Sequence, residues 1–265
     1  METRLKEVLA VVNNKGGVGK TTTVQSLAAA IVREHKNYRV LVVDLDPQCH
    51  LSMLHGFDMQ SPTVYNALRK GDKLPVYKTK RDRVYLCPAS ADLQDVDADL
   101  FRQMNPKKVL QKCFGLPLDD HTDEHLTNII ESFDYVLMDC QPALSQTTFN
   151  AMCVATGLLV PVQMEGLSVN GLGNIIIALK EVQSELNPNL ELRGLLPTMV
   201  DGRPRIVRDF IDYLKRSYGD HVCKTMIHRS VKMNEAQTQL KDIYEYKQWS
   251  TVANDYDALA KELFN

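Results

Sequence analysis

Residues 7–24 read EVLAVVNNKGGVGKTTTV and combine three signals in the order strand, loop, helix. The apolar run 8–12 predicts a strand, and three glycines follow it in a loop where their backbone N–H groups can point inward. Apolar residues then return at helical spacing, at Val24, Leu27, Ala28, Ile31 and Val32. The first N–H groups of such a helix have no partner inside it and carry the positive end of its dipole. This order predicts a phosphate-binding loop that suits a triphosphate.

Two side chains of this loop have chemistry that a bound nucleotide needs. Lys20 is expected to reach the β- and γ-phosphates, and the hydroxyl of Thr21 is expected to bind Mg²⁺. A glycine-rich turn before an ordinary helix is the alternative, but the glycines, the Lys-Thr pair and the flanking elements all favour a phosphate loop. The predicted nucleotide-binding residues here are Lys15, Gly16, Gly17, Val18, Gly19, Lys20, Thr21 and Thr22.

The loop departs from the usual phosphate-binding pattern at two positions. Asn14 stands where a glycine is expected, and a second lysine, Lys15, follows it. The resulting Lys-Gly-Gly-x-Gly-Lys-Thr-Thr resembles the deviant Walker A box of the ParA/MinD ATPases. The resemblance implies ATP and Mg²⁺ as cofactors, and a homodimer that forms on ATP binding. It also implies that Lys15 reaches the partner's nucleotide, where a cation offsets repulsion between phosphates and stabilises charge in the transition state.

Carboxylates follow two further apolar runs. Asp44 and Asp46 come at the end of the run 39–43, and Asp139 ends the run 133–138. Because ligands bind at the carboxyl ends of parallel strands, we expect these acids beside the phosphate loop with Mg²⁺ or water between them. Asp139 has the pattern of a Walker B acid that holds Mg²⁺. The first pair resembles the family's D-x-D-P-Q element, which implies that Asp44 supports the Mg²⁺ shell and that Asp46 orients or activates the attacking water.

Alternating apolar runs indicate an α/β fold. Further strands are expected at 83–88, 157–162 and 192–200, and helices at 64–69, 92–104, 172–186 and 246–264. This alternation predicts a mostly parallel twisted sheet with helices on both faces, and with the loop it indicates a P-loop NTPase of the deviant Walker A type. The 265 residues, 44% of them hydrophobic, are expected to form a single domain over 1–265.

Charge and composition limit the class of protein. No apolar stretch approaches the ~18 residues of a membrane span, and the first residues lack the apolar segment of a signal peptide, so a cytoplasmic location is expected. The six cysteines are scattered without a C-x-x-C pair, which favours reduced thiols over a metal–sulfur site. The formal net charge of −2 gives no overall sign of nucleic-acid binding.

One basic segment stands out against this background. Residues 201–232 contain eight Lys/Arg against four Asp, a net charge of +4. The charge alone leaves sequence-independent binding to duplex DNA and a merely solvated helix face equally open, and the resemblance favours DNA binding. Residues 199–203 and 227–236 resemble the ParA stretches T-M-x-D-x-R and I-P-R-x-V-x-x-x-E-A. The resemblance places Met199 and His228 near the adenine, although His228 replaces the expected proline. The predicted DNA-binding residues are Arg203, Arg205, Arg208, Arg229 and Lys232.

The resemblance implies a ParA-type ATPase that partitions plasmid or chromosome DNA. An ATP-dependent dimer would bind nonspecific double-stranded DNA on the nucleoid, and a ParB-type partner would stimulate hydrolysis and release it. A MinD-like membrane-associated ATPase is the first alternative, but it needs a basic amphipathic anchor, and the acidic segment 246–264 is a poor one, so no membrane partner is expected. An iron–sulfur ATPase of the nitrogenase-reductase kind would need paired cysteines. A metabolic P-loop kinase or ligase would need a small-molecule substrate.

Overall fold

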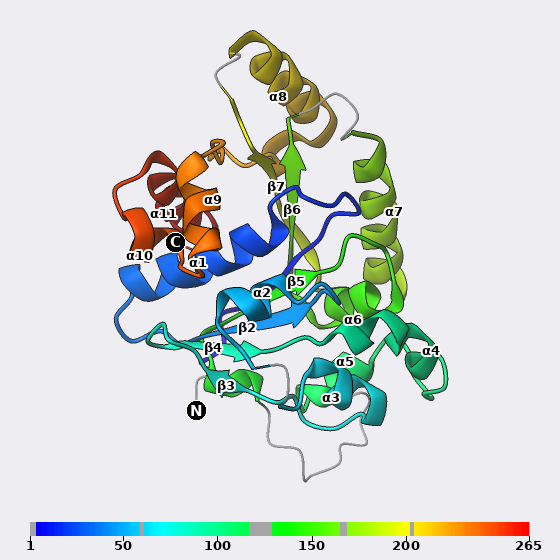
Figure 1. The fold of residues 1–265 in the computed structure, drawn as a ribbon. Coiled ribbons are helices and arrows are strands. Elements are labelled where there is room, and N and C mark those ends of the chain that lie inside the picture. Colours follow the sequence, from blue (N-terminus) through cyan, green and yellow to red (C-terminus); the bar gives the residue numbers. More distant parts are fainter. Residues whose placement is uncertain (1–3, 59–60, 117–128, 165–168, 202–203, 265) are drawn as a thin grey trace.

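The protein is built around a twisted sheet with helices on both faces (Figure 1). The computed structural model describes residues 4–58, 61–116, 129–164, 169–201 and 204–264. Within that part of the chain the sheet has seven strands in the order β3-β4-β2-β5-β1-β6-β7, all parallel except β3, which pairs antiparallel with β4. The strands are β1 Glu7–Val11, β2 Val40–Leu45, β3 Tyr77–Lys78, β4 Val84–Cys87, β5 Tyr135–Cys140, β6 Gly157–Gln163 and β7 Glu191–Thr198. The predicted fold class is confirmed.

Helices occupy most of the connections between these strands and the part of the chain after β7. They are α1 Lys20–Glu34, α2 His50–Leu54, α3 Val64–Lys70, α4 Val96–Leu100, α5 Val109–Cys113, α6 Gln146–Val154, α7 Val169–Glu185, α8 Pro204–Tyr218, α9 Val231–Thr238, α10 Ile243–Lys247 and α11 Thr251–Phe264. The described residues also include short 3₁₀ helices at η1 Ala91–Asp95, η2 Ile130–Ser132 and η3 Gly219–His221. Figure 1 shows α8 beyond the carboxyl end of β6, apart from α9, α10 and α11.

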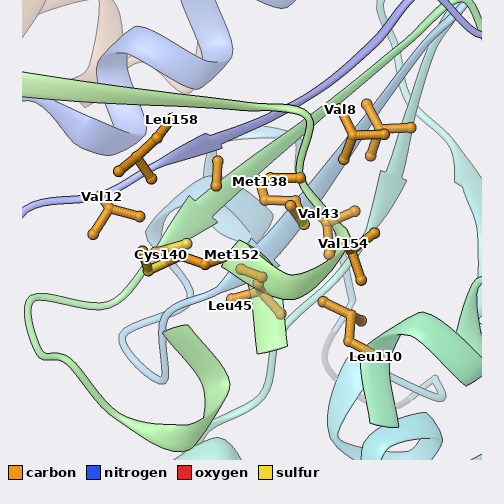
Figure 2. Packing of buried hydrophobic residues seen from close by; sticks show 14 of the residues in the cluster. Val8, Val12, Val43, Leu45, Leu110, Met138, Cys140, Met152, Val154 and Leu158 are labelled. Carbon is orange, nitrogen blue, oxygen red and sulfur yellow. The ribbon is translucent and has the colours of Figure 1, made fainter. Parts of the chain in front are cut away.

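Two hydrophobic layers explain why the central strands are apolar at most positions, with acids only near their ends. Side chains alternate between the two faces of β1, so Val8 packs into one layer and Leu9 into the other. The first layer joins the sheet to α5 and α6, and Figure 2 shows Val8, Met138 and Met152 packed together there. The second layer joins the sheet to α1 and α11. Because helices cover both faces of the sheet, a ligand can reach it only at the ends of the strands.

Two predicted helices are wrong in extent. The helix expected over 92–104 ends at Leu100. Beyond it the chain forms turns, and the apolar side chains of Phe101 and Met104 are exposed, so they do not extend a buried face that would prolong the helix. The helix expected over 246–264 is two helices, α10 and α11. Asp242 caps the first by accepting hydrogen bonds from the N–H groups of residues 244 and 245, and Ser250 starts the second by accepting one from residue 253. The buried apolar face predicted for the last helix is confirmed.

Candidate nucleotide-binding site

The loop between β1 and α1 has the backbone of a phosphate cradle. Gly17 and Gly19 have φ values of +73° and +95°, a left-handed conformation that favours glycine. A Cβ atom built on Gly16, Gly17 or Gly19 would meet nothing within 4 Å, so the space above the loop is open for a ligand. Helix α1 begins at Lys20, directly after Gly19, so its free N–H groups border the same space.

Neighbouring strands hold this loop in place. The Asn13 amide donates a hydrogen bond of 2.6 Å to the carbonyl of Pro161, while its Oδ1 atom accepts one of 2.9 Å from the N–H of Lys15. The Thr198 hydroxyl donates to the carbonyl of Val18 over 2.9 Å. Sequence reasoning missed Asn13 and Thr198. The available signal was a polar residue at the end of β1 and another at the end of β7.

The two lysines of the loop differ in environment. Lys20 is 6% exposed, and its ammonium donates a 3.3 Å hydrogen bond to the carbonyl of Lys15. Burial lowers the pKa of Lys20, while the charges of Asp139 and Asp46 act in the opposite direction. Lys15 is exposed. Lys20 therefore faces the interior of the site and Lys15 its rim.

Asp139 is a buried acid whose oxygens are left without a hydrogen bond. It lies beside Asp44 in the register of β5 and β2, and beside Val11 in the register of β5 and β1. Both of its carboxylate oxygens are buried and have no hydrogen-bond partner among the described residues. Burial raises the pKa of Asp139 well above its usual range and Asp44 adds to this, while nearby Thr21 and Lys20 oppose it. A cation at these oxygens would remove the cost of burying them.

Asp44 is equally buried, but its oxygens accept hydrogen bonds from other residues of the chain. Oδ2 accepts bonds from the Ser52 hydroxyl at 2.6 Å and the Ser52 N–H at 2.9 Å, and Oδ1 accepts one from the N–H of Asp46 at 3.1 Å. Burial raises the pKa of Asp44 to about 6 against these bonds. Asp44 therefore joins β2 to α2. Sequence reasoning missed Ser52, which no motif indicates.

The chemistry of these residues fits Mg²⁺ rather than a metal held by protein alone. No group of three or more His, Cys, Asp or Glu side chains in the described part of the chain could hold a metal ion. Mg²⁺ usually keeps several waters and takes one or two protein ligands together with substrate phosphates. The buried Asp139 carboxylate and the nearby Thr21 hydroxyl suit that arrangement.

A single open pocket of about 760 Å³ brings most of the predicted site residues together. Asp46 lines it, and its Oδ1 atom accepts a 2.9 Å bond from the N–H of Gln48. Met199, in a left-handed conformation with φ +53°, and His228 line it as well. The remaining predicted residues that line it are Gly16, Gly17, Val18, Gly19, Lys20, Thr21, Thr22 and Arg229. Phosphate loop, candidate water-orienting acid and candidate adenine residues thus share one cavity.

The predicted DNA-binding residues fall on two parts of the structure. Arg208 is exposed on α8, where Lys215 and Arg216 are exposed too. Arg205 belongs to the same helix, but its side chain lies outside the described residues, as does Arg203 altogether. Arg229 is exposed at the pocket, and Lys232 on α9 forms a 2.8 Å ion pair with Glu235. The basic segment is therefore divided between α8 and the rim of the pocket.

Known proteins resemble this chain over nearly its whole length. The chromosome-partitioning ATPase Soj of Thermus thermophilus is 36% identical, over 96% of this chain and 94% of that protein. The sporulation initiation inhibitor protein Soj of Bacillus subtilis is 31% identical, over 97% of this chain and 98% of its own length. A crystal structure of cobyrinic acid a,c-diamide synthase from Mycobacterium smegmatis with bound ADP and magnesium is 31% identical, with a TM-score of 0.79 over 97% of this chain and 93% of that one.

The family assignment follows from these matches and from the geometry of the loop. Residues 6–192 match a family model described as an AAA domain. None of the helices that the structure describes is both long and apolar enough to cross a membrane. With its phosphate loop at the start of α1 and its full-length likeness to the Soj proteins, the chain belongs to the ParA/MinD superfamily of P-loop ATPases and is a ParA-like member of it.

Proposed function

We propose that the protein hydrolyses ATP with Mg²⁺ and uses the nucleotide to control pairing of two copies and their binding to DNA. The observation that carries the proposal is the open glycine cradle at the start of α1, with the unpartnered Asp139 beside it and the exposed Lys15 at its rim. The glycine cradle and Asp139 would bind the Mg²⁺-nucleotide. The second lysine accounts for a partner copy.

Each residue of the cradle has a proposed part in the reaction. Lys20 binds the β- and γ-phosphates, and Thr21 and Asp139 hold Mg²⁺, which when bound offsets charge on those phosphates. Asp46 orients or activates the attacking water from its place in the pocket wall. Asp44 supports the Mg²⁺ shell by fixing the turn that carries Asp46, because it accepts the N–H of that residue. These roles need no group beyond ATP, Mg²⁺ and water.

The exposed position of Lys15 supports a nucleotide-dependent homodimer. A lysine from each copy would reach the phosphates bound by the other, which offsets the repulsion between two triphosphates. Without the γ-phosphate much of that attraction is absent, so ATP favours the pair more than ADP does. Pairing doubles the number of basic residues on one particle, and affinity for DNA rises steeply with the number of phosphates neutralised.

The proposed DNA surface consists of the basic residues of α8 and of the pocket rim. Arg208, Lys215 and Arg216 are exposed on α8 together with Asp209 and Asp212, so these residues give the helix only a small excess of positive charge. Val207 and Leu214 fix its other side to the core. Arg203, Arg205, Arg229 and Lys232 complete the proposed set. The basic segment contains no base-reading motif, so it contacts phosphates and binds duplexes of any sequence. The ion pair of Lys232 with Glu235 reduces what that lysine can contribute.

The proposed cellular role is the partition of plasmid or chromosome DNA in the cytoplasm, with the protein associated with the nucleoid. The support is the likeness to proteins named chromosome-partitioning ATPases. A ParB-type protein that binds the cargo would stimulate hydrolysis, separate the two copies and release the DNA.

A metabolic ligase is the competing function, because one similar structure is named as a synthase. DNA binding with ATP, with ADP and without nucleotide, each at two salt concentrations, separates the two. A partition ATPase binds any duplex with ATP and loses affinity steeply as salt rises. Binding that is absent, or equal in all three nucleotide states, would contradict the proposal.

A further inference from the structure

We infer that a second basic surface, formed by residues 69–73 and 99–112 and called here the α3–α5 face, binds an acidic segment of a partner protein that also carries apolar side chains. The face consists of the end of α3, the end of α4 with the turns after it, and most of α5. Figure 1 shows these helices away from α8 and from α9, α10 and α11. None of the residues of the face lines the nucleotide pocket. The face is therefore separate from both proposed sites.

The α3–α5 face carries a dense positive charge. Residues 69–73 and 99–112 contain seven Lys/Arg against two Asp, a net charge of +5 in a chain whose total is −2. Lys107 forms a 2.9 Å ion pair with Glu181 of α7, which lowers the charge of the face to +4. The cations are Arg69, Lys70, Lys73, Arg102, Lys107, Lys108 and Lys112. Neither the nucleotide site nor the basic segment 201–232 explains this charge.

Two contacts bring these stretches of chain onto one surface. The Gln103 amide donates a 2.9 Å hydrogen bond to the carbonyl of Arg69, which joins the turn after α4 to the end of α3. A Cβ atom built on Gly71 would lie 3.3 Å from the ammonium of Lys112, so this side chain of α5 lies against the end of α3. The cations of the two stretches are therefore neighbours in space.

One carboxylate holds two arginines of the face. The Nε atom of Arg69 lies 3.9 Å from one oxygen of Asp99, and the Nη1 atom of Arg102 lies 3.4 Å from the other. The side chains of the two arginines are 60% and 80% exposed. A single acid between two guanidinium groups leaves an excess of positive charge towards solvent. Such groups pair well with the carboxylates of a partner.

Two large apolar side chains are exposed among these cations. Phe101 is 65% exposed and Met104 is 95% exposed, so neither contributes much to the core. A single exposed apolar residue is common, but here two lie within four positions and are flanked by cations. Apolar side chains with a charged rim are typical of interaction sites, because a partner can bury them.

This combination determines the chemistry of the occupant. Duplex DNA offers phosphates to the cations, but little apolar surface to Phe101 and Met104. Proteins lie on a membrane by the apolar face of a helix, and α4 and α5 bury theirs in the core, at Leu100 and Leu110 among others. A protein segment that combines Asp or Glu with Leu or Phe satisfies both groups, since its carboxylates pair with the cations and its apolar side chains cover the exposed pair.

The test measures binding of a fluorescein-labelled peptide that repeats Asp-Glu-Leu-Phe to the full chain without nucleotide, by fluorescence anisotropy. The wild type should bind the peptide with an affinity that falls as salt rises. One control peptide has Asn-Gln in place of Asp-Glu, and another has Ser in place of Leu and Phe. Each should bind about tenfold more weakly, because it lacks one of the two kinds of contact.

Variants of the protein separate the two kinds of contact. Lys70→Gln combined with Arg102→Gln should weaken binding about tenfold, the effect of two exposed ion pairs. Met104→Gln should weaken it about fivefold through the lost apolar contact. The matched controls are Lys36→Gln and Trp249→Gln, at an exposed cation and an exposed apolar residue outside the face. Both should bind the peptide as the wild type does.

The outcomes that would overturn the inference are distinct. One is a wild type that does not bind the peptide, and another is a loss of affinity in the control variants as large as in the others. Tighter binding of duplex DNA or of phosphatidylserine vesicles to the same cations would assign the face to those ligands instead.

The chain's own acids are tested separately. Residues 117–128, which lie outside the described residues, contain four acids, Asp119, Asp120, Asp123 and Glu124. If the peptide binds only after these four are changed to the corresponding amides, the face belongs to this segment and not to a partner. Because these measurements use no nucleotide, their failure leaves the proposed ATPase function untouched.

Discussion

Asp139→Asn should stabilise the protein without nucleotide and remove its response to Mg²⁺-ATP. The carboxylate is fully buried, and burial together with the charge of Asp44 outweighs the nearby Thr21 hydroxyl and Lys20 ammonium, so its pKa lies well above the ordinary 3.8. Each unit by which folding raises the pKa lowers the stability of the protein with an ionised Asp139 by about 1.4 kcal/mol. The loss reaches a ceiling of about 4 kcal/mol at pH 7, because above that pKa the folded acid stays protonated. An amide of the same size carries no such charge. Because the amide is buried too and carries its own desolvation cost, the gain in the free energy of unfolding should stay below this ceiling of about 4 kcal/mol.

The measurement is urea unfolding of both proteins between pH 4 and pH 7, with and without Mg²⁺-ATP. Unfolded Asp139 ionises near pH 4 but folded Asp139 does so at higher pH, so the wild type loses stability as pH rises through this window. The advantage of the variant should therefore grow with pH. Mg²⁺-ATP should stabilise only the wild type. A variant no more stable than the wild type at pH 7, and equally stabilised by Mg²⁺-ATP, would refute the reasoning.

The remaining predictions concern the loop, the water and the DNA surface. Lys20→Ala should abolish the thermal shift caused by Mg²⁺-ATP, whereas Lys36→Ala, at an exposed lysine outside the site, should keep it; a retained shift in the first variant would remove Lys20 from phosphate binding. Asp46→Ala should bind ATP but release phosphate slowly and stay on DNA, and unchanged turnover would assign the water to another residue. Arg208→Ala or Arg229→Ala should weaken binding to all duplexes equally and reduce the salt slope by ~1 each, and unchanged slopes would make these arginines merely solvated.

Periodicity and motif spacing predicted the parts of the fold that are local in sequence. The strand, loop and helix around Lys20 are confirmed, because apolar spacing and the glycines lie within one short segment. Asp44 and Asp139 were each predicted near the end of a strand of a parallel sheet, and such ends share one edge. The register of β2 and β5 places the two acids side by side. The helix break near Ser250 was missed because apolar spacing continued across it, although Asp242 and Ser250 are both capping residues.

Contacts between distant residues could not be predicted in this way. The bonds from Asn13 to Pro161 and from Thr198 to Val18 join residues 148 and 180 positions apart. No period or motif relates such pairs, because they depend on how the sheet brings separate strand ends together. The same is true of Asp255, whose bond to His228 appears only once α11 is packed. Sequence thus indicated which groups are candidates for phosphate binding, and the structure was needed to show what holds them.

The most direct test of the central claim is the molar mass of the protein in solution with and without Mg²⁺-ATP. Sedimentation equilibrium of Asp46→Ala, which should hold ATP without turning it over, is suited to this. A chain of 30.0 kDa should sediment at twice that mass with Mg²⁺-ATP and at the single mass with ADP. Lys15→Ala in the same background should remain single in both. A mass that does not change with the nucleotide would contradict the account.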